Sequence, residues 1–227
     1  MLLAGDVGGT KTLLGLFKQV RGKLRVVREE AFESQQYPSL EAIVREFLTR
    51  GRQKVSGFAV GVAGPVIGGT SQVVNVRWPV DARRLKRQLG MTNVRVLNDL
   101  ETTAWGIPHV PSRKFENLTP GLRPGAGNAA LIAAGTGLGM AHLVREENGF
   151  VPQPSEGGHQ SFAPRDDLEI DLLRFMRRRL GRVSVERIVA GPGMSAIYQF
   201  LVESGRGRET AAMSRRLAAG KDANAVV

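Results

Sequence analysis

The chain has 227 residues, of which 42% are hydrophobic and 23% are charged, a composition typical of one large or two small globular domains. It contains no cysteine, which excludes a disulfide scaffold, a cysteine-ligated metal site and a thiol nucleophile. The formal net charge of +11 comes mostly from arginines scattered along the sequence, so the charge alone does not predict nucleic-acid binding.

No apolar stretch approaches the roughly 18 residues that a membrane-spanning helix needs. The first five residues lead directly to Asp6 and contain no signal-peptide apolar region. We therefore expect a cytoplasmic protein that has neither nucleic acid nor a membrane as its partner. The densest basic run, from Arg174 to Arg182, is interpreted as the solvated face of an amphipathic helix. The apolar face of that helix carries Leu168, Leu172, Leu173, Phe175 and Met176.

The first half of the chain alternates short apolar strands with amphipathic helices. Ser39 is predicted to cap one helix, Asp81 a second that ends at Gly90, and a third helix is expected over 100–107. Strands are expected over 2–6, 12–17, 24–32, 58–62, 73–76 and 94–97.

Proline and glycine cluster between 108 and 127, which predicts a junction between domains 1–110 and 111–227. Strands are expected over 129–134 and 140–145, with a turn at 147–149. Helices are expected from Asp166, with Glu169 completing a capping-box-like start, and over 194–203 and 209–219. Gly220 should end the last of these and Asp222 should begin another, so the second domain is expected to be incomplete.

Two glycine-rich hairpins, residues 6–12 and 135–139, lie about one domain apart and form a weak internal repeat. Such turns expose backbone N–H groups that suit phosphate oxygens, and Thr10 and Thr136 add hydroxyl donors. Asp6, just before the first turn, could bind Mg²⁺ directly or through water. Each hairpin alone could be an ordinary turn, but the pair with an aspartate at the end of a strand favours two related lobes around one ligand.

Five motifs in this order make the chain resemble the bacterial glucokinase family, within the actin/hexokinase/Hsp70-type ATPase superfamily. The motifs are residues 5–12, 97–99, 135–139, 155–159 and 184–187. The resemblance implies an α/β fold of two ribonuclease-H-like lobes closing on a cleft, with the second lobe truncated. The related ROK sugar kinases usually carry a cysteine-rich zinc motif, which a chain without cysteine cannot form.

The resemblance assigns Asp99 as the catalytic base that takes the proton from the sugar 6-hydroxyl. An aspartate is ionised at neutral pH and can accept a proton. The alternative is that Asp99 merely caps the helix that follows it. Two further histidines and the two tryptophans, Trp78 and Trp105, are interpreted as structural or core residues.

The other site residues also follow from the resemblance. Substrate-binding residues are Asn98, Asp99, Glu156, His159 and Glu186, of which Glu186 could equally be an ordinary first-turn carboxylate. ATP-binding residues are Gly5, Asp6, Val7, Gly8, Gly9, Thr10, Gly135, Thr136 and Gly137, with Asp6 also the candidate Mg²⁺ ligand.

The expected function is ATP-dependent phosphorylation of glucose at its 6-hydroxyl, giving glucose 6-phosphate and ADP at the entry to glycolysis. Glucose and ATP are the expected partners, ATP and Mg²⁺ are the expected cofactors, and a homodimer is left open. The glycine-rich adenosine-binding segment of the family has no counterpart before Val227. The alternative is therefore a non-catalytic remnant that binds sugar or phosphate.

Overall fold

The computed structural model describes residues 1–51, 53–73, 75–121, 125–147 and 149–219. The chain divides into two compact units, Met1–Leu122 and Arg123–Val227, each with its own sheet and helices. The sequence positions 122–124, at the boundary, lie outside the described residues, as do the predicted turn residue Asn148 and the tail from Gly220. In the part of the chain that the structure describes, no helix is long and apolar enough to cross a bilayer.

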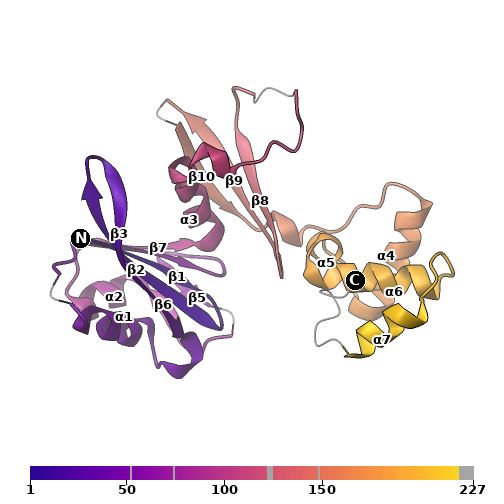
Figure 1. Cartoon of the computed structure of the whole chain (residues 1–227), viewed down its shortest axis with the longest axis horizontal. Helices are drawn as coiled ribbons and strands as arrows, with labels where there is room; N and C mark the ends of the chain where they lie inside the picture. The colour runs from indigo at the N-terminus through magenta and orange to yellow at the C-terminus, as the bar shows by residue number, and fades with distance from the viewer. Residues whose placement is uncertain (52, 74, 122–124, 148, 220–227) are drawn as a thin grey trace. The chain divides into compact units, whose positions relative to one another are not determined.

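The first unit is built on a five-stranded mixed sheet with strand order β3-β2-β1-β4-β7 (Figure 1). Strands β1, β2 and β3 form an antiparallel meander, whereas β4 and β7 join β1 in parallel. The strands of this unit are β1 (Leu2–Val7), β2 (Lys11–Val20), β3 (Lys23–Glu33), β4 (Gly57–Val62), β5 (Thr70–Gln72), β6 (Pro79–Asp81) and β7 (Val94–Asn98). Its helices are α1 (Leu40–Thr49), α2 (Ala82–Leu89) and α3 (Asp99–Gly106), with 3-10 turns η1 (Ser34–Gln36), η2 (Ile107–His109) and η3 (Ser112–Lys114).

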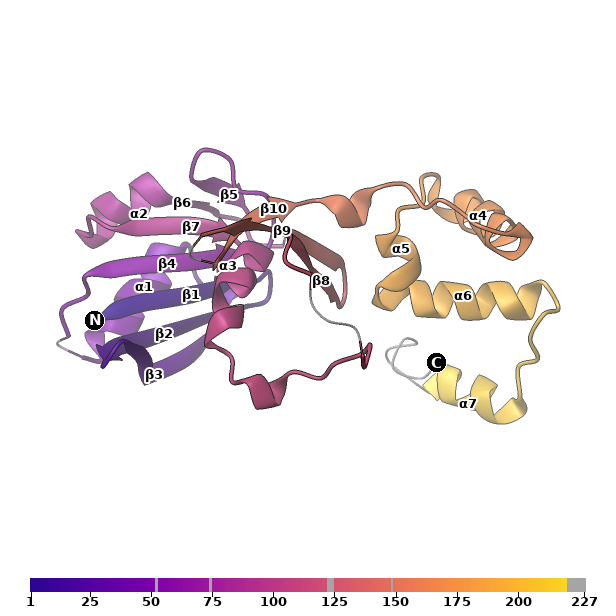
Figure 2. The ribbon, with the colours of Figure 1, turned by 90° about the horizontal axis from the view of Figure 1, so that it is seen from above.

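The two faces of this sheet differ because side chains alternate along a strand. On one face, β1, β4 and β7 bury apolar side chains, and α1 and α2 cover them; these side chains are Leu3, Val7, Phe58, Val60, Val62, Val94 and Val96. Helix α3 lies on the other face in Figures 1 and 2. The core of this unit is one cluster of buried apolar residues: Leu3, Val7, Leu14, Leu16, Phe32, Leu40, Ile43, Val44, Phe47, Phe58, Val60, Val62, Val73, Val76, Trp78, Val80, Leu85, Val94 and Val96.

The predicted helix signals of this unit are confirmed. Ser39 Oγ accepts a hydrogen bond from the Ala42 N–H at 3.2 Å, and Asp81 Oδ1 accepts from the Arg84 N–H at 2.7 Å. Gly90 ends α2 in the left-handed conformation, with φ at 66°, which glycine adopts without a Cβ penalty.

One buried ion pair connects α1 to α2. Glu41 is 3% exposed and its Oε1 lies 3.0 Å from Arg84 Nε, while Oε2 has no hydrogen-bond partner among the described residues. We expect Arg84→Ala to lower the free energy of unfolding by about 2 kcal/mol, because it leaves the Glu41 carboxylate buried and unpaired. The effect is at the low end for buried pairs because the Arg84 side chain is 37% exposed.

Urea unfolding of the purified chain measures this effect. Arg87→Ala, on an exposed face of the same helix, is the matched control and should change stability by no more than about 0.5 kcal/mol. Equal effects of the two substitutions would contradict a stabilising role for the pair.

The second unit begins with a three-stranded antiparallel sheet in the order β10-β9-β8. Its strands are β8 (Ala129–Ala134), β9 (Leu138–Glu146) and β10 (Gly149–Ser155). The 3-10 turn η4 (Gly157–His159) follows, and then α4 (Asp167–Leu180), α5 (Glu186–Val189), α6 (Gly191–Glu203) and α7 (Ala211–Ala219). Strands β8 and β9 were predicted from the sequence, whereas β10 was not. Strand β10 carries two prolines, Pro152 and Pro154, which argue against a strand in the sequence but are tolerated at a sheet edge.

The helical part of this unit has its own core, in which Phe175 and Phe200 meet edge to face at 5.5 Å between ring centroids. The capping prediction for α4 is confirmed, since Asp166 Oδ1 accepts from the Glu169 N–H at 2.8 Å. The apolar face predicted for α4 is confirmed except at Leu168, which is 46% exposed.

Two other expectations about the fold are wrong. The strand expected over 73–76 is placed wrongly. Strand β5 ends at Gln72, and Val73 and Val76 are buried in irregular chain. Trp105 is 47% exposed on α3, whereas Trp78 is in the core as expected. The arginines of the run on α4 are exposed, as expected. Among them, the Arg179 guanidinium also stacks 3.6 Å from the Phe175 ring centroid and pairs with Glu203.

Candidate active site

The carboxyl ends of the parallel strands in the first unit carry two aspartates. Asp6 on β1 aligns with Gly61 on β4, and Gly61 aligns with Leu97 on β7, the strand that leads through Asn98 into Asp99. Neighbouring strands lie about 4.8 Å apart, so this register brings both carboxylates to one edge of the sheet. The charge of Asp99 acts on Asp6, as expected for two such neighbours.

A glycine lets α3, which begins at Asp99, approach this edge. A Cβ on Gly61 would come 2.5 Å from Thr102 Oγ1, closer than real side chains tolerate. The Thr102 hydroxyl in turn donates to the backbone oxygen of Asp99 at 2.7 Å. The position of Asp99 therefore depends on the missing side chain at Gly61.

Asn98 is the residue that caps α3. Its Oδ1 accepts from the N–H groups of Leu100 at 2.9 Å and Glu101 at 3.3 Å, and its Nδ2 donates to Gly64 O at 3.1 Å. Asn98 is buried, so its amide is held mainly by the protein. The structure thus gives the cap to Asn98, while Asp99 Oδ1 accepts from the adjacent Leu100 N–H at 2.9 Å.

Both aspartates have a raised pKa. For Asp99 the main cause is burial, and hydrogen bonds from the Leu100 N–H, its own N–H and the Asn98 side chain oppose it by favouring the ionised form. For Asp6 the larger cause is partial burial of the carboxylate, which raises its pKa. The like charge of Asp99 raises the pKa of Asp6 further. A cation placed near both would relieve this repulsion, so the pair fits Mg²⁺ bound directly or through water. No group of three or more metal-ligating side chains occurs in the described ranges.

The predicted ATP-binding run of the first unit separates into two parts. Gly5 and Val7 lie inside β1: Val7 is fully buried, and a Cβ on Gly5 would come 3.0 Å from the Leu14 side chain. Gly8, Gly9 and Thr10 form the turn to β2, closed by a hydrogen bond from the Gly8 N–H to Lys11 O at 2.9 Å. Only these three residues can offer an accessible loop.

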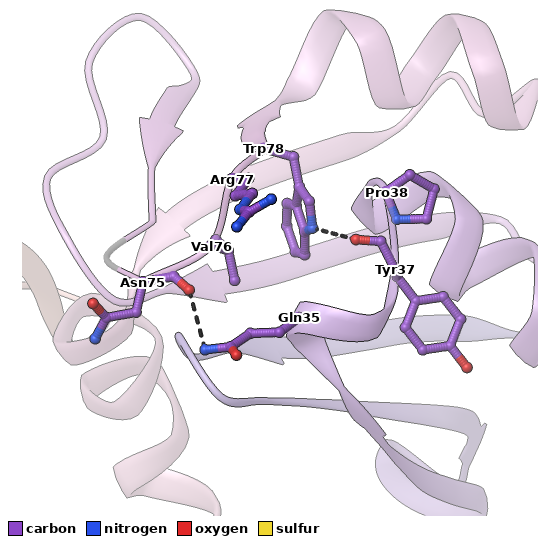
Figure 3. A pocket seen from close by; sticks show the side chains of 7 residues that line it. All are labelled: Gln35, Tyr37, Pro38, Asn75, Val76, Arg77 and Trp78. Atoms are coloured by element: carbon purple, nitrogen blue, oxygen red, sulfur yellow. Dashed lines mark hydrogen bonds between the residues drawn. The ribbon is translucent and has the colours of Figure 1, made fainter.

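A cavity of about 620 Å³ lies beside η1, in the first unit (Figure 3). Gln35 Nε2 reaches both Gly9 O and Asn75 O at 3.4 Å, so one cavity wall is linked to the turn. The indole N–H of Trp78 donates to Tyr37 O at 2.9 Å and closes the opposite wall. The lining residues are Gln35, Tyr37, Pro38, Asn75, Val76, Arg77 and Trp78.

The second glycine turn, in the second unit, joins β8 to β9. The Gly135 N–H donates to Gly137 O, and the Gly191 N–H at the start of α6 donates to Gly135 O, both at 2.8 Å. Glu186 Oε2 accepts from the Leu138 N–H at 2.9 Å. A Cβ on Gly137 would lie 2.8 Å from that same oxygen. The turn is therefore held by groups from α5 and α6.

Three predicted sugar-binding residues come together in the second unit. His159 lies between two carboxylates: its Nε2 is 3.6 Å from Glu156 Oε2, and its Nδ1 is 3.7 Å from Glu186 Oε1. Glu156 and His159 are each more than half exposed, whereas Glu186 is 22% exposed. The group thus offers carboxylate acceptors and an imidazole to one small region of the surface.

Two backbone hydrogen bonds explain how His159 and Glu186, 27 positions apart in the sequence, come together. The Phe162 N–H donates to Val183 O at 3.0 Å and the Val185 N–H to Gln160 O at 2.9 Å. These bonds place the end of η4 beside the start of α5. Arg182, which sequence reasoning placed on a solvated helix face, lies beyond α4 and donates to His159 O at 2.6 Å.

Sequence reasoning missed Gly61, which leaves room for Thr102, and Ser34, whose hydroxyl donates to Gly8 O of the first glycine turn at 2.9 Å. No local sequence pattern indicates these two residues, because their roles depend on neighbours that are distant in the sequence. The glycine pair 157–158 did carry a signal: a Cβ on Gly158 would come 2.1 Å from Leu138 O. Close approach at this turn was predicted from the sequence and agrees with that distance.

The chain matches a protein-family model described as Glucokinase over residues 3–226. It belongs to the glucokinase family. The glucokinase of Nostoc punctiforme is 36% identical over 222 residues, and that of Klebsiella pneumoniae is 37% identical over 205 residues. The matches cover 96% and 89% of this chain but 64% and 62% of those relatives, so the chain spans less than two thirds of their length.

Solved glucokinase structures share the fold. A glucokinase from an Antarctic psychrotroph superposes with a TM-score of 0.79 and 26% identity, covering 99% of this chain and 73% of that one. A ROK-family glucokinase from Streptomyces griseus superposes with a TM-score of 0.55 at 20% identity, covering 100% of this chain and 67% of that one. The two-lobed ribonuclease-H-like α/β fold expected from the sequence is therefore confirmed.

Proposed function

We propose that this member of the glucokinase family transfers the γ-phosphoryl group of ATP to the 6-hydroxyl of glucose, giving glucose 6-phosphate and ADP. Glucose and ATP are then its substrates, Mg²⁺ is its cofactor, and its place is at the entry to glycolysis in the cytoplasm. The observation that carries the proposal is at the end of β7, where Asn98 caps the helix and the Asp99 carboxylate is left available for chemistry.

Asp99 is the proposed general base. As the 6-oxygen attacks the γ-phosphorus, Asp99 takes the hydroxyl proton, and the bond from phosphorus to the leaving oxygen of ADP breaks. Partial burial keeps its pKa above that of a free aspartate, closer to the working pH, which favours proton acceptance in the transition state. The hydrogen bonds to Asp99 hold the carboxylate in one orientation.

The group of Glu156, His159 and Glu186 in the second unit is the proposed sugar-recognition group. Asn98 of the first unit is a further proposed substrate-binding residue. Carboxylates accept hydrogen bonds from vicinal hydroxyls, and an imidazole can donate or accept. A sugar epimer that lacks one hydroxyl in the correct place would leave a desolvated acceptor unpaired, which is the basis proposed for specificity.

The glycine turns at Gly8–Thr10 and Gly135–Gly137 are the proposed phosphate-binding loops. The Gly8 and Gly135 N–H groups are bonded within the turns. The other backbone N–H groups of the turns and the hydroxyls of Thr10 and Thr136 are of the right type to donate to phosphate oxygens. Mg²⁺, when bound, neutralises charge on the transferring phosphoryl group. Asp6 would hold the ion through water or directly.

An assay of ADP release with ATP, Mg²⁺ and glucose tests the proposal on the purified 227-residue chain. Glucose-dependent release supports the kinase. Tight glucose binding without release would instead favour the alternative function, a sugar- or phosphate-binding protein without catalysis.

The pH dependence of turnover is a second test. Because burial raises the pKa of Asp99 above its ordinary value of 3.8, the base is lost by protonation at a higher pH than a free aspartate would be. We expect the acid limb of the kcat/KM profile, which reports the free enzyme, to have an apparent pKa above 3.8. A limb at or below the ordinary value would contradict the assignment of Asp99.

A further inference from the structure

The backbone carbonyl groups of the first glycine turn all point to the same element, η1. Ser34 Oγ donates to Gly8 O at 2.9 Å, the Ser34 N–H donates to Thr10 O at 2.8 Å, and Gln35 Nε2 donates to Gly9 O at a longer 3.4 Å. Three successive carbonyls are thus engaged by two consecutive residues of η1.

This anchoring has a consequence for the N–H groups of the turn. In a planar trans peptide, the C=O of one residue and the N–H of the next point in opposite directions. When the carbonyls of Gly8, Gly9 and Thr10 face η1, the N–H groups of Gly9, Thr10 and Lys11 face away from it. Glycine-rich backbone has many accessible conformations, so the carbonyl anchors select the one that presents donors outward.

The hydroxyl of Ser34 is itself oriented by a buried neighbour. Thr12 Oγ1 lies 2.9 Å from Ser34 Oγ, and both residues are fully buried. A carbonyl oxygen can only accept, so the single Ser34 proton goes to Gly8 O. Thr12 must then be the donor to Ser34, which gives a defined chain from Thr12 through Ser34 to the turn.

We propose that Ser34, oriented by Thr12, is a positioning residue that fixes the first glycine turn with its N–H groups directed at the phosphates of the nucleotide. The inference rests on the proposed function, since it concerns the same phosphate loop. Donors that are fixed before the ligand binds stabilise phosphate charge without an ordering cost at the moment of reaction. Neither Ser34 nor Thr12 touches the substrate in this assignment.

The test uses four variants of the full chain. Ser34→Ala removes the anchor to Gly8 O, and Thr12→Val removes the orienting hydroxyl at nearly constant volume. Thr12→Ser is the matched control, because it keeps the hydroxyl and loses only a buried methyl group. Gln35→Met removes the longer contact to Gly9 O.

Two measurements are made on each variant. The first is the affinity for MgADP, by titration calorimetry, together with the KM for MgATP and for glucose. The second is amide hydrogen exchange at the N–H groups of Gly8 and Ser34, which are bonded to Lys11 O and Thr10 O and so report on the turn itself.

For Ser34→Ala we expect about a tenfold loss of MgADP affinity and a matching rise in the KM for MgATP, the effect of one well-formed hydrogen bond. The KM for glucose should stay within about twofold, and exchange at Gly8 should accelerate at least about tenfold. Thr12→Val should show the same pattern more weakly, whereas Thr12→Ser should keep nucleotide affinity while lowering the melting temperature. Gln35→Met should have the smallest effect.

Faster exchange with unchanged nucleotide affinity would overturn the positioning role, and so would unchanged exchange in Ser34→Ala. A wild-type chain that binds no nucleotide would count against the proposed function instead. The exchange data would then still decide whether Ser34 holds the turn.

Discussion

Asp99→Asn should lower glucose-dependent ADP release by a factor of about 10² to 10⁴, the usual contribution of a general base. The amide keeps the size of the side chain and its ability to accept from the Leu100 N–H, but it cannot take a proton at neutral pH. Glucose binding should change little, because the sugar contacts proposed for Glu156, His159 and Glu186 remain. A coupled assay for kcat and a calorimetric titration with glucose measure the two quantities separately.

The same substitution should leave the fold slightly more stable. The pKa of Asp99 is raised in the folded chain, mainly by burial, so the folded state binds the proton more tightly than the unfolded state does. Protonation below the folded pKa therefore stabilises the fold, and the ionised carboxylate at neutral pH destabilises it. Replacing it with a neutral amide removes this cost, and we expect the melting temperature to rise by about 2 °C.

Asn98→Ala is the stability reference for the helix start, and it is not an activity control because Asn98 is itself a proposed substrate contact. It removes the cap of α3 and should destabilise the chain by about 1 kcal/mol, while the Asp99 carboxylate itself remains. A loss of turnover in Asp99→Asn with a parallel loss of stability would indicate that Asp99 is only a structural residue of the helix start. Retained turnover in Asp99→Asn would show that a group other than Asp99 accepts the proton.

Local chemistry explains how much of the fold could be predicted from the sequence. The caps at Ser39, Asp81 and Asp166 and the left-handed Gly90 were predictable because each depends on residues within four positions. The buried strands β4 and β7 were predictable from their short apolar runs. Strand β10 was not, because its prolines argue against a strand unless its edge position is known.

The candidate site divides in the same way. Asp99 and the glycine turns have motif signals, and Glu156, His159 and Glu186 could be named from the family resemblance. Their assembly around His159 depends on pairing between residues 160–162 and 183–185, which no local pattern encodes. The same holds for Ser34, whose contacts with Gly8 and Thr12 join residues more than twenty positions apart.

Gly158→Ala, which adds one methyl group to the turn between Glu156 and His159, should have the second large effect, on glucose binding. A Cβ on Gly158 would come 2.1 Å from Leu138 O and 3.1 Å from the carbonyl carbon, both backbone atoms of β9 that cannot move away independently. Gly158→Ala must therefore shift η4 relative to β9. Because Leu138 also donates its N–H to Glu186, the shift disturbs both carboxylates that flank His159.

Gly157→Ala is the matched control, one residue away in the same turn. Its added Cβ would meet Met140 Sδ at 2.9 Å and Ser155 Oγ at 3.2 Å, which are side-chain atoms able to rotate away. We expect Gly158→Ala to weaken glucose binding at least about tenfold and to destabilise the chain by about 1–3 kcal/mol, as overpacking does. Gly157→Ala should weaken glucose binding no more than about threefold.

Calorimetric glucose titration and urea unfolding of both variants distinguish the site from the scaffold. A Gly158→Ala chain that is folded and has lost glucose affinity would show that the glycine holds the His159 group in its binding geometry. If that variant is too unstable to titrate at room temperature, titration at a lower temperature gives the affinity. Equal glucose affinity of the two alanine variants and the wild-type chain would show that Glu156, His159 and Glu186 do not bind the sugar. A displaced η4 must change the geometry of these three side chains.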